Sequence, residues 1–133
     1  MRTLIALCTL FLFLTCAVAH GGTIKVLNES DPGSKVDIEK YVTRGKITIF
    51  DFFATWCGPC NDIAPYLEKL QKDRHDVQVH KIDIKEWGSP VCTQYDIKSV
   101  PNFRVYDSNG KLQYQGKEAY QQVILMIKGA GGK

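Results

Sequence analysis

The stretch Phe52-Phe53-Ala54-Thr55-Trp56-Cys57-Gly58-Pro59-Cys60 places two cysteines, separated by two residues, between an apolar run and an amphipathic segment. Residues 47–53 are rich in β-branched and aromatic side chains, which predicts a buried strand. After the cysteines, apolar residues recur at helical spacing at Ile63, Tyr66, Leu67 and Leu70. The sequence therefore predicts a strand that leads directly into a helix, with Cys57 at or just before the helix N-terminus.

The predicted position of Cys57 favours its ionised form. Unpaired amide N–H groups and the positive end of the helix dipole stabilise an anion there, and the thiolate is the nucleophile of disulfide exchange. Cys60, one turn further along, is expected to attack a mixed disulfide formed at Cys57. Two alternatives remain open. One is half of a zinc site, although the chain lacks a second ligand pair at suitable spacing, and the other is a structural disulfide, although so short a loop gains little entropy.

Strand and helix patterns alternate on both sides of this stretch. The near-continuous apolar character of residues 46–53 indicates helices on both faces of a sheet, and Ser108-Asn109-Gly110 predicts a hairpin. We expect an α/β fold with a central mixed five-stranded sheet and the cysteine pair at the carboxyl end of the central strand. The predicted strands are 24–26, 46–53, 77–84, 103–106 and 112–114, the last ended by Gly116, and the predicted helices are 36–42, 57–73, 91–95 and 120–127, followed by a tail at 129–133.

Residues 1–19 have the pattern of a signal peptide. Arg2 is followed by an apolar run and by the small residues Ala17-Val18-Ala19, so we expect cleavage before His20 and one domain over residues 20–133. The alternatives are a retained membrane anchor and lipidation at Cys16, and in each case the folded part is exported. The formal net charge of +3 and the lack of a basic run give no indication of nucleic-acid binding.

Residues 51–60 resemble the active-site segment of the thioredoxin family, with Trp-Cys-Gly-Pro-Cys complete and an acid six residues before the first cysteine. Further matches follow in order at Pro65, Lys81, Val100-Pro101 and Gly116, and the resemblance covers roughly residues 23–129. It implies a thioredoxin fold and thiol-disulfide exchange.

The resemblance also implies catalytic roles. Asp51 interrupts an apolar strand, where desolvation favours the protonated acid, and by resemblance it exchanges a proton with Cys60 while Lys81 acts as its electrostatic partner. The alternatives are a structural hydrogen-bonding acid for Asp51 and an ordinary surface lysine for Lys81.

Substrate contacts are implied in the same way. The Val100–Pro101 bond would be cis and would present the Val100 main chain to an extended substrate. Asn102 replaces the threonine that commonly follows this proline, which puts the fine substrate preference in doubt. The expected apolar docking rim around Cys57 consists of Trp56, Gly58, Pro59, Val100, Pro101 and Gly116.

Two tryptophans and one cysteine allow a structural interpretation instead of, or besides, a functional one. Trp56 could instead be a core residue, because aromatic side chains dominate cores. Trp87 has no match in the resemblance and is interpreted as surface or loop packing. Cys92 is interpreted as a small buried residue, with a reactive thiol as the alternative.

The expected function is reduction of protein disulfides by an exported, periplasmic or secreted monomer without metal or cofactor. Its electrons would come from a membrane-embedded thiol donor. The Gly58-Pro59 spacer resembles reducing thioredoxins, because it lacks the histidine that stabilises the thiolate in oxidants. A disulfide oxidant or isomerase, or a non-catalytic binding module with the same fold, are the alternatives.

Overall fold

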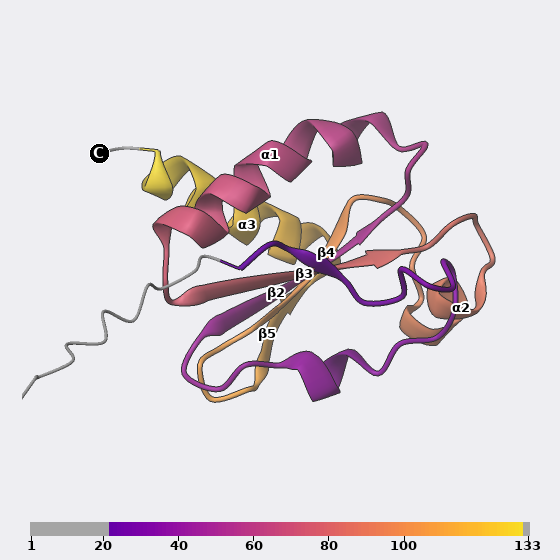
Figure 1. Ribbon diagram of the computed structural model, residues 1–133, viewed down its shortest axis with the longest axis horizontal. Helices are drawn as coiled ribbons and strands as arrows, with labels where there is room; N and C mark the ends of the chain where they lie inside the picture. Colours follow the sequence, from indigo (N-terminus) through magenta and orange to yellow (C-terminus); the bar gives the residue numbers. More distant parts are fainter. Residues whose placement is uncertain (1–21, 132–133) are drawn as a thin grey trace, which may run out of the picture.

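Strand β2 (Ile47–Phe53) is the centre of the sheet. In the computed structural model, which describes residues 22–131, it pairs in parallel with β3 and antiparallel with β4. The sheet order is β1-β3-β2-β4-β5 (Figure 1). The other elements, in chain order, are β1 (Lys25–Val26), the 3-10 turn η1 (Ile38–Tyr41), α1 (Gly58–Asp73), β3 (Val77–Asp83), α2 (Pro90–Tyr95), β4 (Asn102–Tyr106), β5 (Leu112–Gln115) and α3 (Gly116–Ala130).

Helices cover both faces of the sheet. Helices α1 and α3 lie on one face, and α2 and η1 lie on the other (Figure 1). Alternate residues of β2 pack into the two hydrophobic cores, one on each face of the sheet. Ile49 lies on the face of α1 and α3, and Phe50 and Phe52 lie on the opposite face. This explains why the strand is apolar along almost its whole length, and it confirms the predicted mixed α/β sheet.

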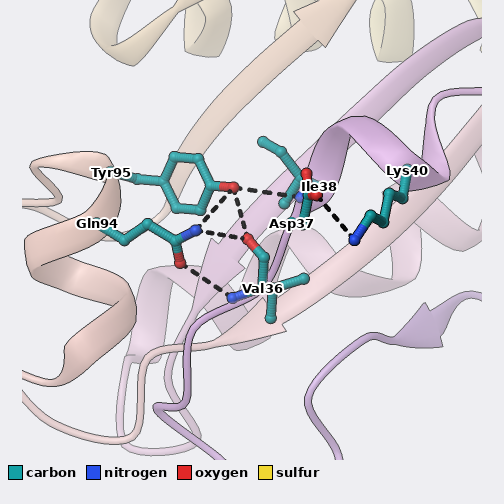
Figure 2. A network of polar contacts seen from close by, with 6 residues as sticks. All are labelled: Val36, Asp37, Ile38, Lys40, Gln94 and Tyr95. Atoms are coloured by element: carbon teal, nitrogen blue, oxygen red, sulfur yellow. Dashed lines mark hydrogen bonds and ion pairs between the residues drawn. The ribbon is translucent and has the colours of Figure 1, made fainter.

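The expected helix at 36–42 is only the short turn η1 (Figure 2). The backbone of Val36 is bonded to side chains of α2: its N–H donates to Gln94 Oε1 at 3.0 Å, and its carbonyl accepts from Gln94 Nε2 at 3.0 Å and from the Tyr95 hydroxyl. The Ile38 N–H donates to the same hydroxyl at 3.2 Å. The Val36 carbonyl, which would accept the first hydrogen bond of a helix that begins there, is thus bonded to side chains of α2.

The C-terminal part of the chain also differs from the expectation. Gly116 is the first residue of α3 rather than the end of a strand, and the helix continues through Gly129 and Ala130, which were expected to belong to a tail. The reason is packing, because Ile127 and Ala130 lie against the core on the α1 face and extend the apolar side of the helix.

Within residues 22–131, no helix combines the length and apolar character needed to cross a membrane. The predicted signal peptide at 1–19, with its alternatives, lies outside the described residues.

Candidate active site

The cysteine pair lies where β2 leads into α1. Cys57 is the N-cap of α1, and its sulfur accepts a hydrogen bond from the Cys60 N–H at 3.2 Å. The two cysteines form a disulfide. Pro59 is in the first turn, where the lack of an N–H costs nothing. The predicted placement of Cys57 just before a helix is confirmed, and the helix begins one residue later at Gly58.

The two sulfurs differ in access. Cys57 is 5% exposed and Cys60 is fully buried. In the dithiol form, the same backbone N–H and the dipole of the 16-residue helix favour a thiolate at Cys57. The geometry therefore makes Cys57 the sulfur that an outside disulfide can reach and Cys60 the sulfur behind it.

Asp51 is a fully buried acid on the same strand that delivers the cysteines. Strand alternation places it on the face of Ile49, which is the face that α1 covers. Neither carboxyl oxygen has a hydrogen-bond partner among the described residues, and the catalytic role of Asp51 stays a prediction. Burial raises the pKa of Asp51 to about 7, and the attraction of Lys81 opposes this rise only in part.

Lys81 pairs with Asp51 in the β2–β3 register. Its ammonium lies 3.9 Å from Asp51 Oδ2 and 4.1 Å from the centre of the Phe53 ring. Its side chain is only 17% exposed. The cation therefore lies between the acid and an aromatic face, and its role as the electrostatic partner of Asp51 stays a prediction.

The Val100–Pro101 bond is cis, as expected. Strand β4 follows at once, and its first residue Asn102 pairs with Phe52 near the end of β2. Val100 packs against the core cluster that contains both cysteines. The loop before β4 thus lies at the same edge of the sheet as the disulfide.

For the predicted docking rim, the structure gives the exposure of Trp56, Gly58 and Pro59 and the position of Gly116. Trp56 is 52% exposed, so the alternative of a core tryptophan is wrong, and its Nε1–H donates to the Lys85 carbonyl at 2.6 Å. Gly58 and Pro59 are exposed. Gly116 lies at the junction of β5 and α3 with a φ of +61°, and its role in substrate contact stays a prediction.

Trp87 is the neighbour that the sequence analysis missed. Its ring lies 5.5 Å from the Trp56 ring, edge to face at 61°, and it is 51% exposed. One signal could have found it: Trp87 follows β3 by four residues, and the carboxyl ends of the parallel strands β2 and β3 meet at one edge of the sheet.

Cys92 is buried and free, which confirms its predicted burial. In the part of the chain from 22 to 131, no three side chains of histidine, cysteine, aspartate or glutamate come together as a metal site.

A disulfide at the N-terminus of a helix, delivered by the central strand of a mixed sheet and accompanied by a buried acid, defines the class: a thiol-disulfide oxidoreductase. The family model described as Thioredoxin matches residues 30–128. This chain belongs to the thioredoxin family.

Individual relatives agree with this assignment. Thioredoxin-1 of Caenorhabditis elegans is 42% identical over 65 residues, which cover 49% of this chain and 55% of the worm protein, so the match spans little more than half of that relative. The chloroplastic thioredoxin Y of rice is 33% identical over 84% of this chain and 66% of its own length. Among solved structures, the oxidised thioredoxin of Plasmodium falciparum has a TM-score of 0.57 at 29% identity, covering 81% of this chain and 99% of that one.

Proposed function

We propose that this protein reduces disulfides in other proteins. The observation that carries the proposal is the neutral, exposed Gly58-Pro59 spacer beside the N-cap sulfur of Cys57. The helix dipole favours a thiolate at Cys57, but the spacer adds no cation that would hold the thiolate more strongly. A pair stabilised less as thiolate is a better reductant, because its disulfide form is relatively favoured.

The reaction has two steps. The Cys57 thiolate attacks one sulfur of the substrate disulfide, so that a mixed disulfide forms and the other substrate sulfur leaves as a thiolate and takes up a proton. Cys60 then loses its proton to the Asp51 carboxylate and attacks Cys57 Sγ. The Cys57–Cys60 disulfide closes, and the second substrate sulfur leaves. Two electrons pass to the substrate.

Asp51 suits the role of proton acceptor because its pKa of about 7 lets both of its protonation states exist near neutral pH. Lys81 is the positioning cation that keeps the pKa of the buried acid from rising further. These roles rest on the position, burial and charge of the two side chains.

The compartment in which the protein acts is proposed from residues 1–19. The signal-peptide pattern of residues 1–19 supports export to a periplasmic or extracellular space, where the protein would act as a monomer. After each turnover the disulfide must be reduced by another dithiol. A membrane-embedded thiol donor fits an exported reductase, because a soluble reductase driven by a cytosolic nucleotide would be on the wrong side.

The same export pattern favours the second candidate, a disulfide oxidant or isomerase, because disulfides persist in that compartment. An insulin-reduction assay with a dithiol as electron source tests the proposal. Precipitation of the insulin B chain is expected with the wild type and not with Cys57→Ser. Absence of turnover in the wild type would instead favour a binding module that keeps the disulfide as a permanent link.

A further inference from the structure

Trp56 and Trp87 form a surface of two indole rings beside the disulfide. Each ring is about half exposed, at 52% and 51%, and the rings meet edge to face. Trp56 directly precedes Cys57 in the chain. Large exposed aromatic side chains that lie together next to a reactive group are typical of protein-binding surfaces.

Hydrogen bonds hold the Trp56 ring and both ends of the loop that carries Trp87. The Trp56 indole N–H is bonded to the Lys85 carbonyl, which belongs to the loop that carries Trp87. That loop is fixed at its start, where the Lys85 N–H donates to Asp83 Oδ1 at 2.7 Å. At its end the Val91 N–H donates to the Gly33 carbonyl at 3.1 Å. Binding at a loop that is already ordered loses less conformational entropy than binding at a mobile one.

Trp87 also lines a groove. It has a volume of about 400 Å³ and lies between residues 31–35 and 85–90, with Trp87 in its wall. Gly33 has a φ of +85°, and a Cβ there would lie 3.2 Å from Lys85 Cβ, so the two walls of the groove are closely packed against each other at its base. Helix α2, which follows the groove, is tied to Val36 by Gln94 and Tyr95 (Figure 2).

The charges around the groove indicate the chemistry of its occupant. Its ionisable lining residues carry two negative and two positive charges and therefore nearly cancel: Asp31, Glu86, Lys35 and Lys85. A partner selected by net charge would not be distinguished here. The two indoles provide apolar area, so the discriminating contact is with a large apolar or aromatic side chain.

We propose that Trp87 is a specificity-determining residue for the disulfide exchange. With Trp56 it binds a large apolar side chain of an extended substrate segment, close in sequence to the disulfide that Cys57 attacks. This inference rests on the proposed function. The occupant is a protein substrate rather than a small disulfide, because the rings extend the surface from Cys57 toward the groove, where a chain flanking the reacting sulfur would run.

The test compares two peptides, each with one internal disulfide, that differ only in having Phe or Ser two residues from the reacting cysteine. For the wild type we expect kcat/KM to be about ten-fold higher with the Phe peptide, as for removal of one good aromatic contact. In Trp87→Ala the preference should fall below about two-fold, with the loss in KM rather than in kcat. Trp87→Phe should retain most of it.

Tyr66→Ala is the matched control, since Tyr66 is a 57% exposed aromatic residue on α1 that lines a different groove with Ile127 and Lys128. The Tyr66→Ala variant should keep the preference for the Phe peptide. The reduction potential of the cysteine pair in Trp87→Ala should equal that of the wild type, because docking does not change the stability of the disulfide. A changed potential, or an equal loss of rate with both peptides, would show that Trp87 acts through the cysteines and would overturn the inference.

Reduction of 5,5′-dithiobis(2-nitrobenzoate) by the wild type distinguishes failure of the inference about Trp87 from failure of the reductase proposal. If the wild type reduces this small disulfide and both peptides at similar kcat/KM, the inference about Trp87 is wrong while the reductase proposal stands. If the wild type reduces neither the small disulfide nor the peptides, both are wrong.

Discussion

The carboxylate of Asp51 and the ammonium of Lys81 face each other across paired positions of β2 and β3, with 3.9 Å between Oδ2 and Nζ. The acid is fully buried and neither of its oxygens has a hydrogen-bond partner in the described part of the chain. The cation is therefore its main compensation, and it is incomplete, since the pKa of Asp51 is still raised to about 7. A buried acid in this state lowers the stability of the fold, which is consistent with the proton-transfer role proposed for it.

Asp51→Asn is expected to stabilise the fold at pH 8 and to have little effect at pH 4. The folded pKa of Asp51, about 7, lies above the unfolded value of 3.8, so the native state binds the extra proton and stability falls as pH rises between these values. The cost is complete above pH 7 and amounts to at most about 4 kcal/mol. Urea unfolding of the oxidised protein at both pH values measures it. A gain of equal size at pH 4 and pH 8 would contradict this prediction.

Lys81→Met should shift the pH dependence of the resolving step upward. The attraction of Lys81 lowers the pKa of Asp51, so its removal raises that pKa, and Asp51 accepts the Cys60 proton only at higher pH. Stopped-flow measurement of mixed-disulfide decay from pH 6 to 9 gives the midpoint. Lys69→Met, at an exposed lysine paired with Asp73, should leave this midpoint unchanged.

Asp51→Asn should slow the resolving step and remove its pH midpoint. Unchanged turnover would exclude Asp51 from the mechanism.

Cys57→Ser should abolish turnover, whereas Cys60→Ser should accumulate mixed disulfides with substrates. The reason is access: Cys57 is 5% exposed at the helix N-terminus, and Cys60 is fully buried and can act only on a sulfur already joined to Cys57. Non-reducing gels show the trapped species. Trapping by Cys57→Ser rather than by Cys60→Ser would reverse the assignment.

The reduction potential of the Cys57–Cys60 pair should lie nearer the thioredoxin value of roughly −270 mV than the roughly −120 mV of a strong oxidant. The Gly58-Pro59 spacer supplies no cation for the thiolate. Because 30 mV corresponds to about 1.4 kcal/mol, these two values differ by about 7 kcal/mol and are easily distinguished. Equilibration with glutathione buffers, followed by tryptophan fluorescence, gives the value. A potential above about −180 mV would support an oxidant or isomerase instead.

The sequence predicted the parts of this molecule that depend on local pattern. The apolar run before Cys57 and the helical spacing after it predicted the strand-to-helix junction, and the near-continuous apolar strand predicted helices on both faces. Contacts between distant segments were harder. The Val36 backbone is bound by Gln94 and Tyr95, 58 and 59 residues away, and no local pattern near Val36 indicates this.

The candidate site likewise contains residues that the local sequence predicts and a contact that it does not. The motif predicted Cys57, Cys60 and Asp51, but the meeting of Trp56 and Trp87 depends on the conformation of a loop. That loop contains Lys85 at a φ of +62° and Gly88 at +78°, and the left-handed conformation of a lysine is not signalled by its residue type. The ends of β2 and β3 indicate only that the two tryptophans lie at the same edge of the sheet, whereas the contact of their rings also depends on the conformation of this loop.

The burial of Cys92 has a consequence for how long the protein stays intact. Its thiol is buried in the same core cluster as the disulfide and donates a hydrogen bond to the Glu86 carbonyl at 3.7 Å, so folding keeps it away from the exchange reactions at Cys57. Thermal unfolding removes this protection and allows the freed thiol to scramble the existing bridge or to crosslink two chains. The native packing thus shields Cys92 from oxidation, and loss of that packing in an oxidising medium makes the damage permanent.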